Sequence, residues 1–527
     1  MIFYRKQPFP LSDRGEKVSS AMKRNRQPVE KKRSETDATY NHVLKYTGVF
    51  GGVQGLTMLM SIVRNKLAVL LLGTAGFGLI SIYNSIATFV SSTSNLGIPF
   101  SAVRHVAELF EKGSEEEIKA YVCVVRTWSL WIALLGVAVC LLFSPFISYF
   151  SFDGDWSYAG RICWLSPMIF ALAVTGGEIS ILKGVRRLKR VAFISAAGAV
   201  STLIFTVPFF YRWGSEGIIP ALVASTVVLM GIHLYFSVRV YPWQVALFSS
   251  DVFREGMAMV RLGVAYVLAA IAGSLSALAI PALLLKFGSF DDVGLYRGGY
   301  GLMVTYAGMV FVAVEADYFP RLSSVNDDAV RLNKVINQQI EVCLLLMSPF
   351  LIVFMLLMPL VVRLLYSSDF LVVVDMAVCA TFYMFFRALS VPVAYTALAK
   401  GDSLTYLLME VIYDIVVVGL IAWGYLTWGL VGTGVALSLA GLFDWGLIGV
   451  SYHYKYGFRL SEMALRLALS QFVCVAVALG ACLYAGWAVK CVLGGAALLF
   501  SLWLSFGVLK REATLPGGWK EKFFRKR

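Results

Sequence analysis

Residues 67–98 read LAVLLLGTAGFGLISIYNSIATFVSSTSNLGI, and this stretch shows the pattern that governs the whole chain. The end of one apolar run is followed by a short glycine-rich turn and then by a second apolar run. A bilayer core about 30 Å thick requires about 20 apolar residues per helix. We find fourteen such runs, which predict an all-α polytopic membrane protein; their limits are 47–72, 76–98, 122–148, 161–183, 191–211, 217–238, 262–286, 294–317, 341–365, 371–398, 404–426, 430–452, 464–486 and 489–509.

The composition supports the membrane prediction. Only 15% of the 527 residues are charged and 58% are hydrophobic, whereas a soluble domain carries about 25% charged residues. The 8 cysteines lie mostly inside apolar runs without metal-ligand spacing, and the 4 histidines are scattered along the chain. The sequence therefore predicts no metal site, no cofactor and no catalytic cluster.

The net charge of +14 reflects membrane orientation rather than binding to nucleic acid. With the N-terminus placed in the cytoplasm, 36 of the 46 Lys and Arg residues lie on the inner side and about 5 on the outer side. Lys and Arg accumulate in the cytoplasmic loops of membrane proteins. The distribution predicts a multi-pass protein with both termini cytoplasmic, with membrane lipids and no nucleic acid as partners.

The longest loop between apolar runs divides the chain into two halves. We predict a basic cytoplasmic arm, an N-lobe of six spans, a cytoplasmic linker, a C-lobe of six spans, an extra pair of spans and a basic cytoplasmic tail, at residues 1–43, 44–238, 239–261, 262–455, 456–509 and 510–527. The extra pair either forms a groove for lipid entry or packs outside the lobes.

The two halves share a local repeat. The stretch Gly73–Tyr83 resembles Gly288–Tyr296, and each follows an apolar run that ends in leucines. Six spans lie between them, so the halves have the same orientation and are related by an axis along the membrane normal. Such a repeat predicts a substrate cavity between the halves. The alternative is a chance coincidence of two Gly-Leu turns.

Polar side chains form stripes on the first two predicted spans. Thr57, Ser61 and Arg64 share one helical face of the first span. On the second, the stripe contains Asn84 and also Ser81, Thr88, Ser91 and Asn95. We predict that Arg64 and Asn84 line the cavity; the alternative for the second stripe is hydrogen bonding between packed helices.

Two further arginines lie within the predicted C-lobe. Arg297 is near the outer end of its span, and Arg387 is near the centre of another. A central arginine costs about 2.5–3.5 kcal/mol to insert into a membrane, so a partner is required. Arg387 either forms a structural salt bridge with an intramembrane carboxylate or contributes to an anion site, for which the planar guanidinium is suited.

Three intramembrane carboxylates are candidates for coupling transport to an ion. Glu410 and Asp414 are four residues apart and share a helical face, while Glu178 follows a Gly-Gly pair in the fourth span. Such groups can exchange a proton or bind Na⁺ during a transport cycle. The alternative is that the Glu410–Asp414 pair supplies the charge partner of Arg387.

The chain resembles the Wzx-type O-antigen and capsule flippases of the multidrug/oligosaccharidyl-lipid/polysaccharide (MOP) superfamily over most of residues 44–455. The resemblance is carried by three sets of motifs: Leu71–Leu79 with Asn95–Ile98 and Arg104–Glu108; Asp291–Tyr296 with Phe319–Ser323; and Ala399–Lys400 with Tyr406–Glu410. It implies two six-helix lobes, alternating access and a cationic central cavity. One departure is the length, since many relatives have twelve spans, and this difference raises the related lipid II flippases as an alternative.

The resemblance also implies the cargo. This would be an undecaprenyl-pyrophosphate-linked oligosaccharide, carried from the cytoplasmic to the outer leaflet of the bacterial inner membrane. The pyrophosphate would lie among Arg64, Asn84, Arg297 and Arg387, and the polysaccharide polymerase machinery is a further candidate partner. A drug antiporter coupled to cations is the rival transporter. An enzyme, such as a membrane glycosyltransferase, is disfavoured because the predicted outer loops are short, and a scaffold without transport is the remaining alternative.

Overall fold

The computed structural model describes residues 13–308, 311, 318–319, 321–325 and 328–514, and every regular element in this part of the chain is helical. Ten of the described helices are long and apolar enough to cross a membrane. The prediction of an all-α, multi-pass membrane protein is confirmed. Residues 1–12 of the predicted arm and 515–527 of the predicted tail lie outside the described residues.

The N-terminal half contains seven α-helices before the loop that joins the halves. They are α1 (Asp13–Ser94), α2 (Ile98–Lys112), α3 (Glu115–Ser151), α4 (Ala159–Cys163), α5 (Ser166–Gly184), α6 (Leu188–Trp213) and α7 (Ile218–Val238), with the short 3₁₀ helix η1 (Gly214–Gly217) between the last two. The irregular part of the loop covers residues 239–249. Helix α8 then begins at Ser250, inside the predicted linker.

The C-terminal half continues from α8 (Ser250–Phe287) with helices of very different lengths. They are α9 (Phe290–Tyr300), η2 (Gly301–Tyr306), α11 (Ala329–Leu365), η3 (Ser368–Val372), α12 (Val373–Cys379), α13 (Thr381–Ala399), α14 (Ser403–Tyr456), α15 (Glu462–Tyr484) and α16 (Trp487–Thr514). Several begin at a Ser or Asp whose side chain accepts a hydrogen bond from the first turn, as Ser249, Ser289, Asp328 and Ser461 do.

Glycines break three of the ten long helices. Gly73 interrupts α1 with φ +70°, and Gly429 interrupts α14 with φ +60°. In α14 the chain turns so tightly that a Cβ on Gly432 would meet the carbonyl oxygen of Gly424. The third break is the η1 turn between α6 and α7. These breaks fall where the sequence predicts boundaries between spans.

The predicted number of fourteen spans stays a prediction. The span expected at 294–317 begins in α9 and η2, but residues 309–310 and 312–317 lie outside the described residues. The predicted domain limits likewise stay predictions.

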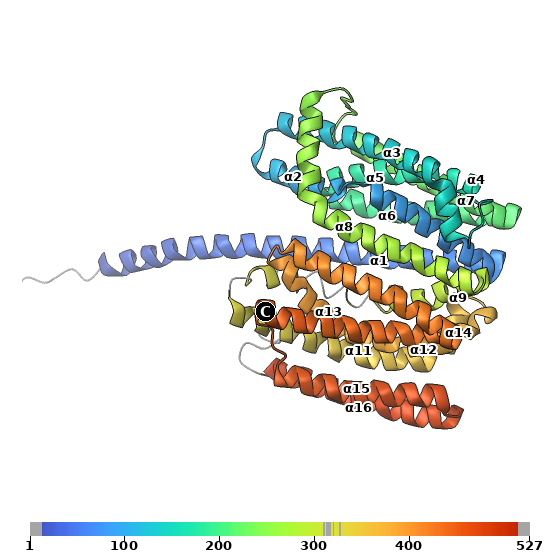
Figure 1. Cartoon of the computed structure of the whole chain (residues 1–527). Helices are drawn as coiled ribbons and strands as arrows, with labels where there is room; N and C mark the ends of the chain where they lie inside the picture. The colour runs from blue at the N-terminus through green and yellow to red at the C-terminus, as the bar shows by residue number, and fades with distance from the viewer. Residues whose placement is uncertain (1–12, 309–310, 312–317, 320, 326–327, 515–527) are drawn as a thin grey trace, which may run out of the picture.

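The helices form two groups on either side of α1, as Figure 1 shows. Helices α2, α3, α5, α6 and α7 lie on one side, and α11 to α16 lie on the other. Helices α1 and α8 connect the groups, since α1 packs against both α6 and α9, and α8 packs against both α3 and α14. This arrangement places α1 and α8 where a cavity between the two halves would lie.

The final helix pair packs on the outer face of the second group. Helices α15 and α16 contact α11 (Figure 1). Buried Gln471 of α15 accepts a hydrogen bond from Ser501 Oγ (2.6 Å) and donates one to Ser505 Oγ (3.3 Å), and Ser505 donates to the Leu345 carbonyl (3.1 Å). Polar side chains of this kind hold membrane helices together.

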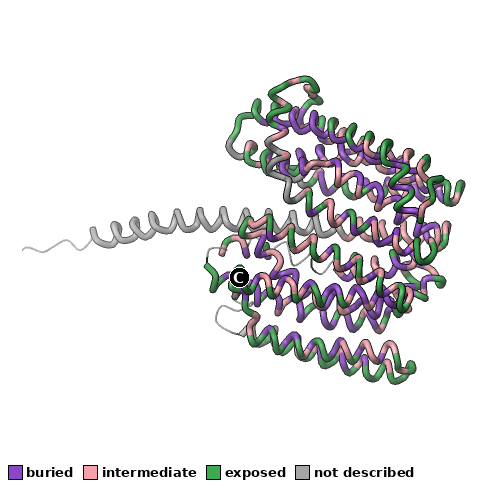
Figure 2. The backbone as a smooth tube through the Cα atoms, viewed as in Figure 1, coloured by how far each residue is buried: buried purple, intermediate pink, exposed green. Residues whose placement is uncertain are grey.

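The outer surface of the helices is apolar. Figure 2 shows exposed residues along the outside of both groups and buried residues in their interior. The exposed set includes large side chains such as Leu142, Phe146, Leu360 and Trp503, each more than 60% exposed. A surface of this kind is stable in hydrocarbon and unfavourable in water, which agrees with a membrane-embedded chain.

Candidate functional site

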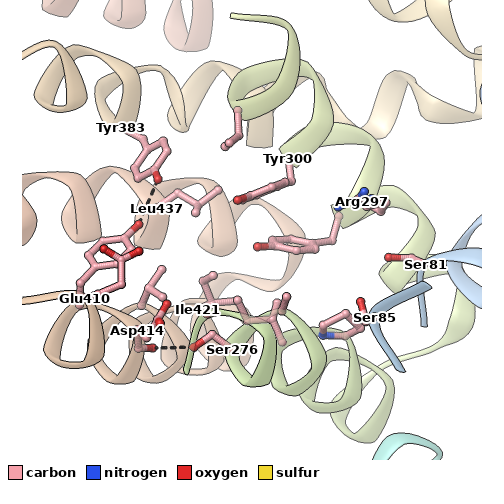
Figure 3. Close-up of a pocket in the computed structure, with 18 of the residues that line it drawn as sticks. Ser81, Ser85, Ser276, Arg297, Tyr300, Tyr383, Glu410, Asp414, Ile421 and Leu437 are labelled. Atoms are coloured by element: carbon pink, nitrogen blue, oxygen red, sulfur yellow. Dashed lines mark hydrogen bonds between the residues drawn. The ribbon is translucent and has the colours of Figure 1, made fainter. Parts of the chain in front are cut away.

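A cavity of about 370 Å³ is lined by α1, α8, α9, η2, α13 and α14 (Figure 3). Its lining brings together four of the predicted site residues, Arg297, Arg387, Glu410 and Asp414. The other lining residues are polar, aromatic or apolar: Ser81, Ser85, Gly273, Ser276, Ala277, Ile280, Pro281, Tyr296, Tyr300, Val304, Tyr383, Tyr413, Val417, Ile421 and Leu437. The wall is therefore mixed rather than uniformly apolar.

Arg387 has a carboxylate partner but is not enclosed by it. Its Nη1 lies 3.5 Å from Asp444 Oδ2, and the arginine side chain is 35% exposed while the carboxylate is 5% exposed. Ser390 Oγ donates a further hydrogen bond to Asp444 Oδ2 at 2.7 Å. The structural salt bridge foreseen as an alternative is present, and its partner is Asp444 rather than Glu410 or Asp414. The exposed part of the guanidinium remains available to a ligand in the cavity.

Arg297 is the more open of the two arginines. It lies on α9, its side chain is exposed, and among the described residues it forms no ion pair or hydrogen bond. In Figure 3 it points toward the end of the cavity formed by Ser81 and Ser85 of α1. A cation in this position, within a helix bundle and without a carboxylate partner, is ready to bind an anion.

Arg64 and Asn84 lie outside the lining of this cavity. The Arg64 guanidinium donates to Asn65 Oδ1 from Nε (3.3 Å) and Nη2 (3.0 Å), and Asn65 Nδ2 donates to the Tyr306 hydroxyl (3.4 Å). Arg64 is close enough to Arg297 for their charges to repel. Asn84 donates to the carbonyl of Ile80 on its own helix (2.9 Å).

Glu410 and Asp414 line the cavity from α14, at the other end from Arg297 (Figure 3). Asp414 is buried, and its Oδ2 has no hydrogen-bond partner among the described residues. Ser276 Oγ of α8 donates to the backbone carbonyl of Asp414 (3.5 Å) and also interacts with the carboxylate. Glu410 interacts electrostatically with both Asp414 and Arg387. An unpartnered carboxylate oxygen in this place can take up a proton or a small cation.

The cavity therefore carries charges of both signs. The resemblance implied a cationic cavity, whereas the lining contains two arginines and two carboxylates. Arg387 interacts with Glu410 and with two tyrosines, and the Tyr413 hydroxyl donates to the Tyr383 hydroxyl at 3.1 Å. Such a lining offers an arginine without a carboxylate partner at one end, and an arginine together with carboxylates and tyrosine hydroxyls at the other.

Glu178 lies away from this cavity in a closed ion pair. Its Oε1 is 3.0 Å from Nε of Arg126, and the two side chains are 2% and 1% exposed. The same guanidinium donates to Ser237 Oγ (3.2 Å) and to the carbonyls of Tyr241 (3.1 Å) and Pro242 (2.6 Å). Thus Glu178 and Arg126 hold the start of the loop between the halves. This arrangement favours a structural role for Glu178 over ion coupling.

Sequence reasoning did not select Arg126, Ser85, Tyr300 or Tyr413. Arg126 carried a usable signal, because it is a charge inside the apolar run 122–148. The tyrosines gave little sequence signal, because aromatic residues are common in membrane helices and the direction of their side chains depends on packing. Ser85 is adjacent to the predicted Asn84 but faces the cavity with Ser81.

The chain is similar to known proteins in sequence family and in fold. Residues 43–326 match the family described as polysaccharide biosynthesis protein. No curated protein sequence matches the chain. Among solved structures, the lipid II flippase MurJ in an inward closed conformation is similar with a TM-score of 0.66 at 14% identity, covering 88% of this chain and 99% of that one.

Two structures of multidrug transporters are also similar. An inward-facing MATE family transporter of the MOP superfamily has a TM-score of 0.64 at 13% identity, covering 77% of this chain and 94% of that one. A MATE structure in complex with MaD3S has a TM-score of 0.55 at 12% identity, covering 78% and 94%. At these identities the likeness establishes the fold alone, which the chain shares with a lipid II flippase and with MATE transporters. The named neighbours are a flippase and transporters rather than enzymes.

Proposed function

Because the chain belongs to the family of polysaccharide biosynthesis proteins, we propose that it is a flippase for a lipid-linked, anionic oligosaccharide. The cargo is an undecaprenyl-pyrophosphate-linked glycan, moved from the cytoplasmic to the outer leaflet of the bacterial inner membrane, with both termini of the protein in the cytoplasm. The polysaccharide polymerase machinery would receive the product. The fold shared with a lipid II flippase supports this type of transport.

One observation carries the proposal: Arg297 is exposed to a membrane-embedded cavity and has no ion-pair partner among the described residues. Burying a cation without a partner is unfavourable, so an anionic ligand would gain free energy by binding there. Arg387 adds a second, partly open guanidinium in the same cavity. Two guanidinium groups suit a pyrophosphate, because each can donate two parallel hydrogen bonds to phosphate oxygens.

The cavity must enlarge to admit a glycan. Its volume of about 370 Å³ is at the lower end of the range of about 300–1,000 Å³ for small-ligand pockets. The pyrophosphate and first sugar would lie among Arg297, Arg387 and the tyrosines, while the polyprenyl chain stays in the lipid. Movement of the two helix groups about α1 and α8 would then open the cavity to either side.

Glu410 and Asp414 are the proposed coupling groups. Asp414 has a carboxylate oxygen without a hydrogen-bond partner among the described residues, and Glu410 is near enough to Arg387 to sense its charge. Uptake of a proton or of Na⁺ at this pair would change the electrostatic potential around Arg387. That change would couple the ion to binding or release of the anionic cargo.

The test is complementation of a deletion strain with the wild type, Arg297→Ala, Arg387→Ala and the matched control Arg363→Ala, which lies outside the cavity. We expect the first two variants to lose surface glycan and to accumulate the lipid-linked precursor in the inner leaflet. The control should behave as the wild type at equal membrane abundance. Normal surface glycan in Arg297→Ala cells would refute the anion site.

A double variant separates the anion site from the salt bridge. Arg387→Ala alone leaves Asp444 as an uncompensated buried carboxylate, whereas Arg387→Ala combined with Asp444→Asn does not. If Arg387 binds cargo, the double variant remains inactive. Recovery of transport in the double variant would show that Arg387 acts only as the partner of Asp444.

A cation-coupled drug antiporter is the second candidate function. The carboxylates on α14 and the fold shared with MATE transporters favour it. It predicts efflux of cationic dyes that depends on Asp414 and is unaffected by Arg297→Ala. A lipid II-type flippase would instead support peptidoglycan synthesis in cells that lack their own lipid II flippase.

A further inference from the structure

A second cavity, of about 710 Å³, lies in the N-terminal half between the α4–α5 region and the α6–α7 turn. It shares no lining residue with the central cavity. Its wall is mainly apolar, and the apolar residues come from α5, α6 and α7: Pro167, Phe209, Ile219, Pro220, Val223, Ala224 and Val227. A chamber of this size and composition fits an apolar chain better than a glycan.

Two opposite charges lie at the mouth of this N-lobe cavity. Arg161 of α4 and Glu216 of η1 both line it, and their Nη2 and Oε1 atoms are 3.6 Å apart. Their side chains are 52% and 78% exposed, so both charged groups remain accessible to a ligand. A ligand group with both a negative and a positive charge can contact both residues, whereas a purely anionic group is repelled by Glu216.

A buried tyrosine lies beside Arg161. Tyr83 lines the N-lobe cavity from α1, and its side chain is 1% exposed with an enclosed hydroxyl group. This hydroxyl interacts electrostatically with the Arg161 guanidinium. Tyr83 therefore helps to position Arg161 at the mouth of the cavity.

The mouth lies at the level where lipid headgroups are expected. Exposed aromatic residues gather at the same end of the bundle: Trp164 at 73%, Tyr211 at 81% and Trp213 at 56% exposure. Trp and Tyr are enriched at the interface between membrane and water. The charged mouth of the N-lobe cavity is therefore at headgroup depth, and its apolar wall is at the depth of acyl chains.

We propose that the N-lobe cavity binds one phospholipid with a phosphoethanolamine headgroup. The phosphate accepts hydrogen bonds from Arg161, the primary ammonium donates to Glu216, and an acyl chain lies along the apolar wall of α7. Tyr83 contributes indirectly, because its hydroxyl interacts with the Arg161 guanidinium and helps to position it. A choline headgroup fits less well because its quaternary ammonium has no N–H to donate, and a glycerol headgroup lacks the cation altogether.

The binding can be measured on the purified full-length protein by native mass spectrometry. Phosphatidylethanolamine, phosphatidylcholine and phosphatidylglycerol with identical acyl chains are added in turn. We expect the wild type to retain phosphatidylethanolamine at least about tenfold better than the other two, since one hydrogen bond to a charged group corresponds to roughly that factor. Equal retention of the three lipids, or retention of none, would overturn the proposal.

Three variants test the assignment of the headgroup. Glu216→Gln should remove the preference over phosphatidylcholine, Arg161→Gln should weaken binding of all phospholipids, and Tyr83→Phe should weaken binding while keeping the shape of the wall. Arg212→Gln, at the same end of α6 but outside the cavity, is the matched control and should bind as the wild type does. An unchanged preference in Glu216→Gln, with the protein still folded by its unfolding temperature, refutes the role of the carboxylate.

Discussion

Replacing Glu178 by Gln should destabilise the protein strongly without acting on the central cavity. Glu178 and Arg126 are 2% and 1% exposed, with contacts of 3.0 and 3.4 Å between the carboxylate and the guanidinium. Gln preserves the shape but turns one acceptor into a donor that faces another donor. Removing one partner of a buried ion pair costs about 3–5 kcal/mol. The folded-to-unfolded ratio should therefore fall by about two to four powers of ten.

The surface pair Arg104–Glu108 provides the comparison. Its side chains are 73% and 53% exposed, and its residues are four apart on α2. An exposed helical pair of this kind contributes about 0.3–0.5 kcal/mol, so Glu108→Gln should have almost no effect. Unfolding of both variants by denaturant, in one detergent and at one protein concentration, gives the two free-energy differences.

A second readout follows from the loop that Arg126 holds. Its guanidinium binds the carbonyls of Tyr241 and Pro242, so Glu178→Gln should also expose residues 239–249 to limited proteolysis. The reasoning fails if Glu178→Gln and Glu108→Gln unfold at the same denaturant concentration. If transport is lost while stability is unchanged, Glu178 acts in ion coupling, as its sequence position allowed.

Other predictions concern Arg387, Asp402 and Gly429. Arg387→Lys should reduce transport about tenfold at unchanged abundance, because lysine cannot donate two parallel hydrogen bonds; rates in proteoliposomes test this. Hydrogen bonds, first of all from Lys455, hold the pKa of the Asp402 carboxyl below its usual range. The stability that these hydrogen bonds give is present above the unfolded-state pKa of about 4, and it is lost as the pH falls toward the folded-state pKa. Between pH 6 and pH 3 the unfolding temperature should therefore fall more in the wild type than in Asp402→Asn. Gly429→Ala should cost about 1–3 kcal/mol because its φ of +60° and ψ of −142° suit glycine. Gly419→Ala, in a regular helix with open space around it, should instead stabilise the protein by about 0.4–1 kcal/mol in the same unfolding measurement.

The fold was predictable because the solvent imposes it. A chain in hydrocarbon must satisfy its backbone hydrogen bonds internally, so each apolar run of about 20 residues becomes a helix. The glycines that end these runs also mark real breaks, as Gly73 and Gly429 show. The glycine-rich start of the second span lies directly against the start of α9, since a Cβ on Gly78 would meet the carbonyl of Phe290. Only glycine allows α1 and α9 to approach so closely there.

The site was only partly predictable, because periodicity gives a helical face but not its neighbours. Arg297, Arg387, Glu410 and Asp414 converge on one cavity, as charges inside membrane helices tend to do. The same reasoning failed to identify the partner of Glu178, because Arg126 is 52 residues away in the sequence. Pairing between distant helices depends on packing, which no local pattern contains.

The mixture of positive and negative charges in the central cavity is the feature that connects the site to the proposed transport. A uniformly cationic cavity would bind an anionic headgroup and release it slowly. In this cavity Arg387 forms an ion pair with Asp444, and the carboxylates of Glu410 and Asp414 also line the wall. Whether these carboxylates are ionised or occupied by a cation then sets how much of the positive potential the cargo meets. A coupling free energy of only about 1–3 kcal/mol changes affinity by roughly 5- to 150-fold, so under the proposed function a small change in this balance would switch the cavity between binding and release.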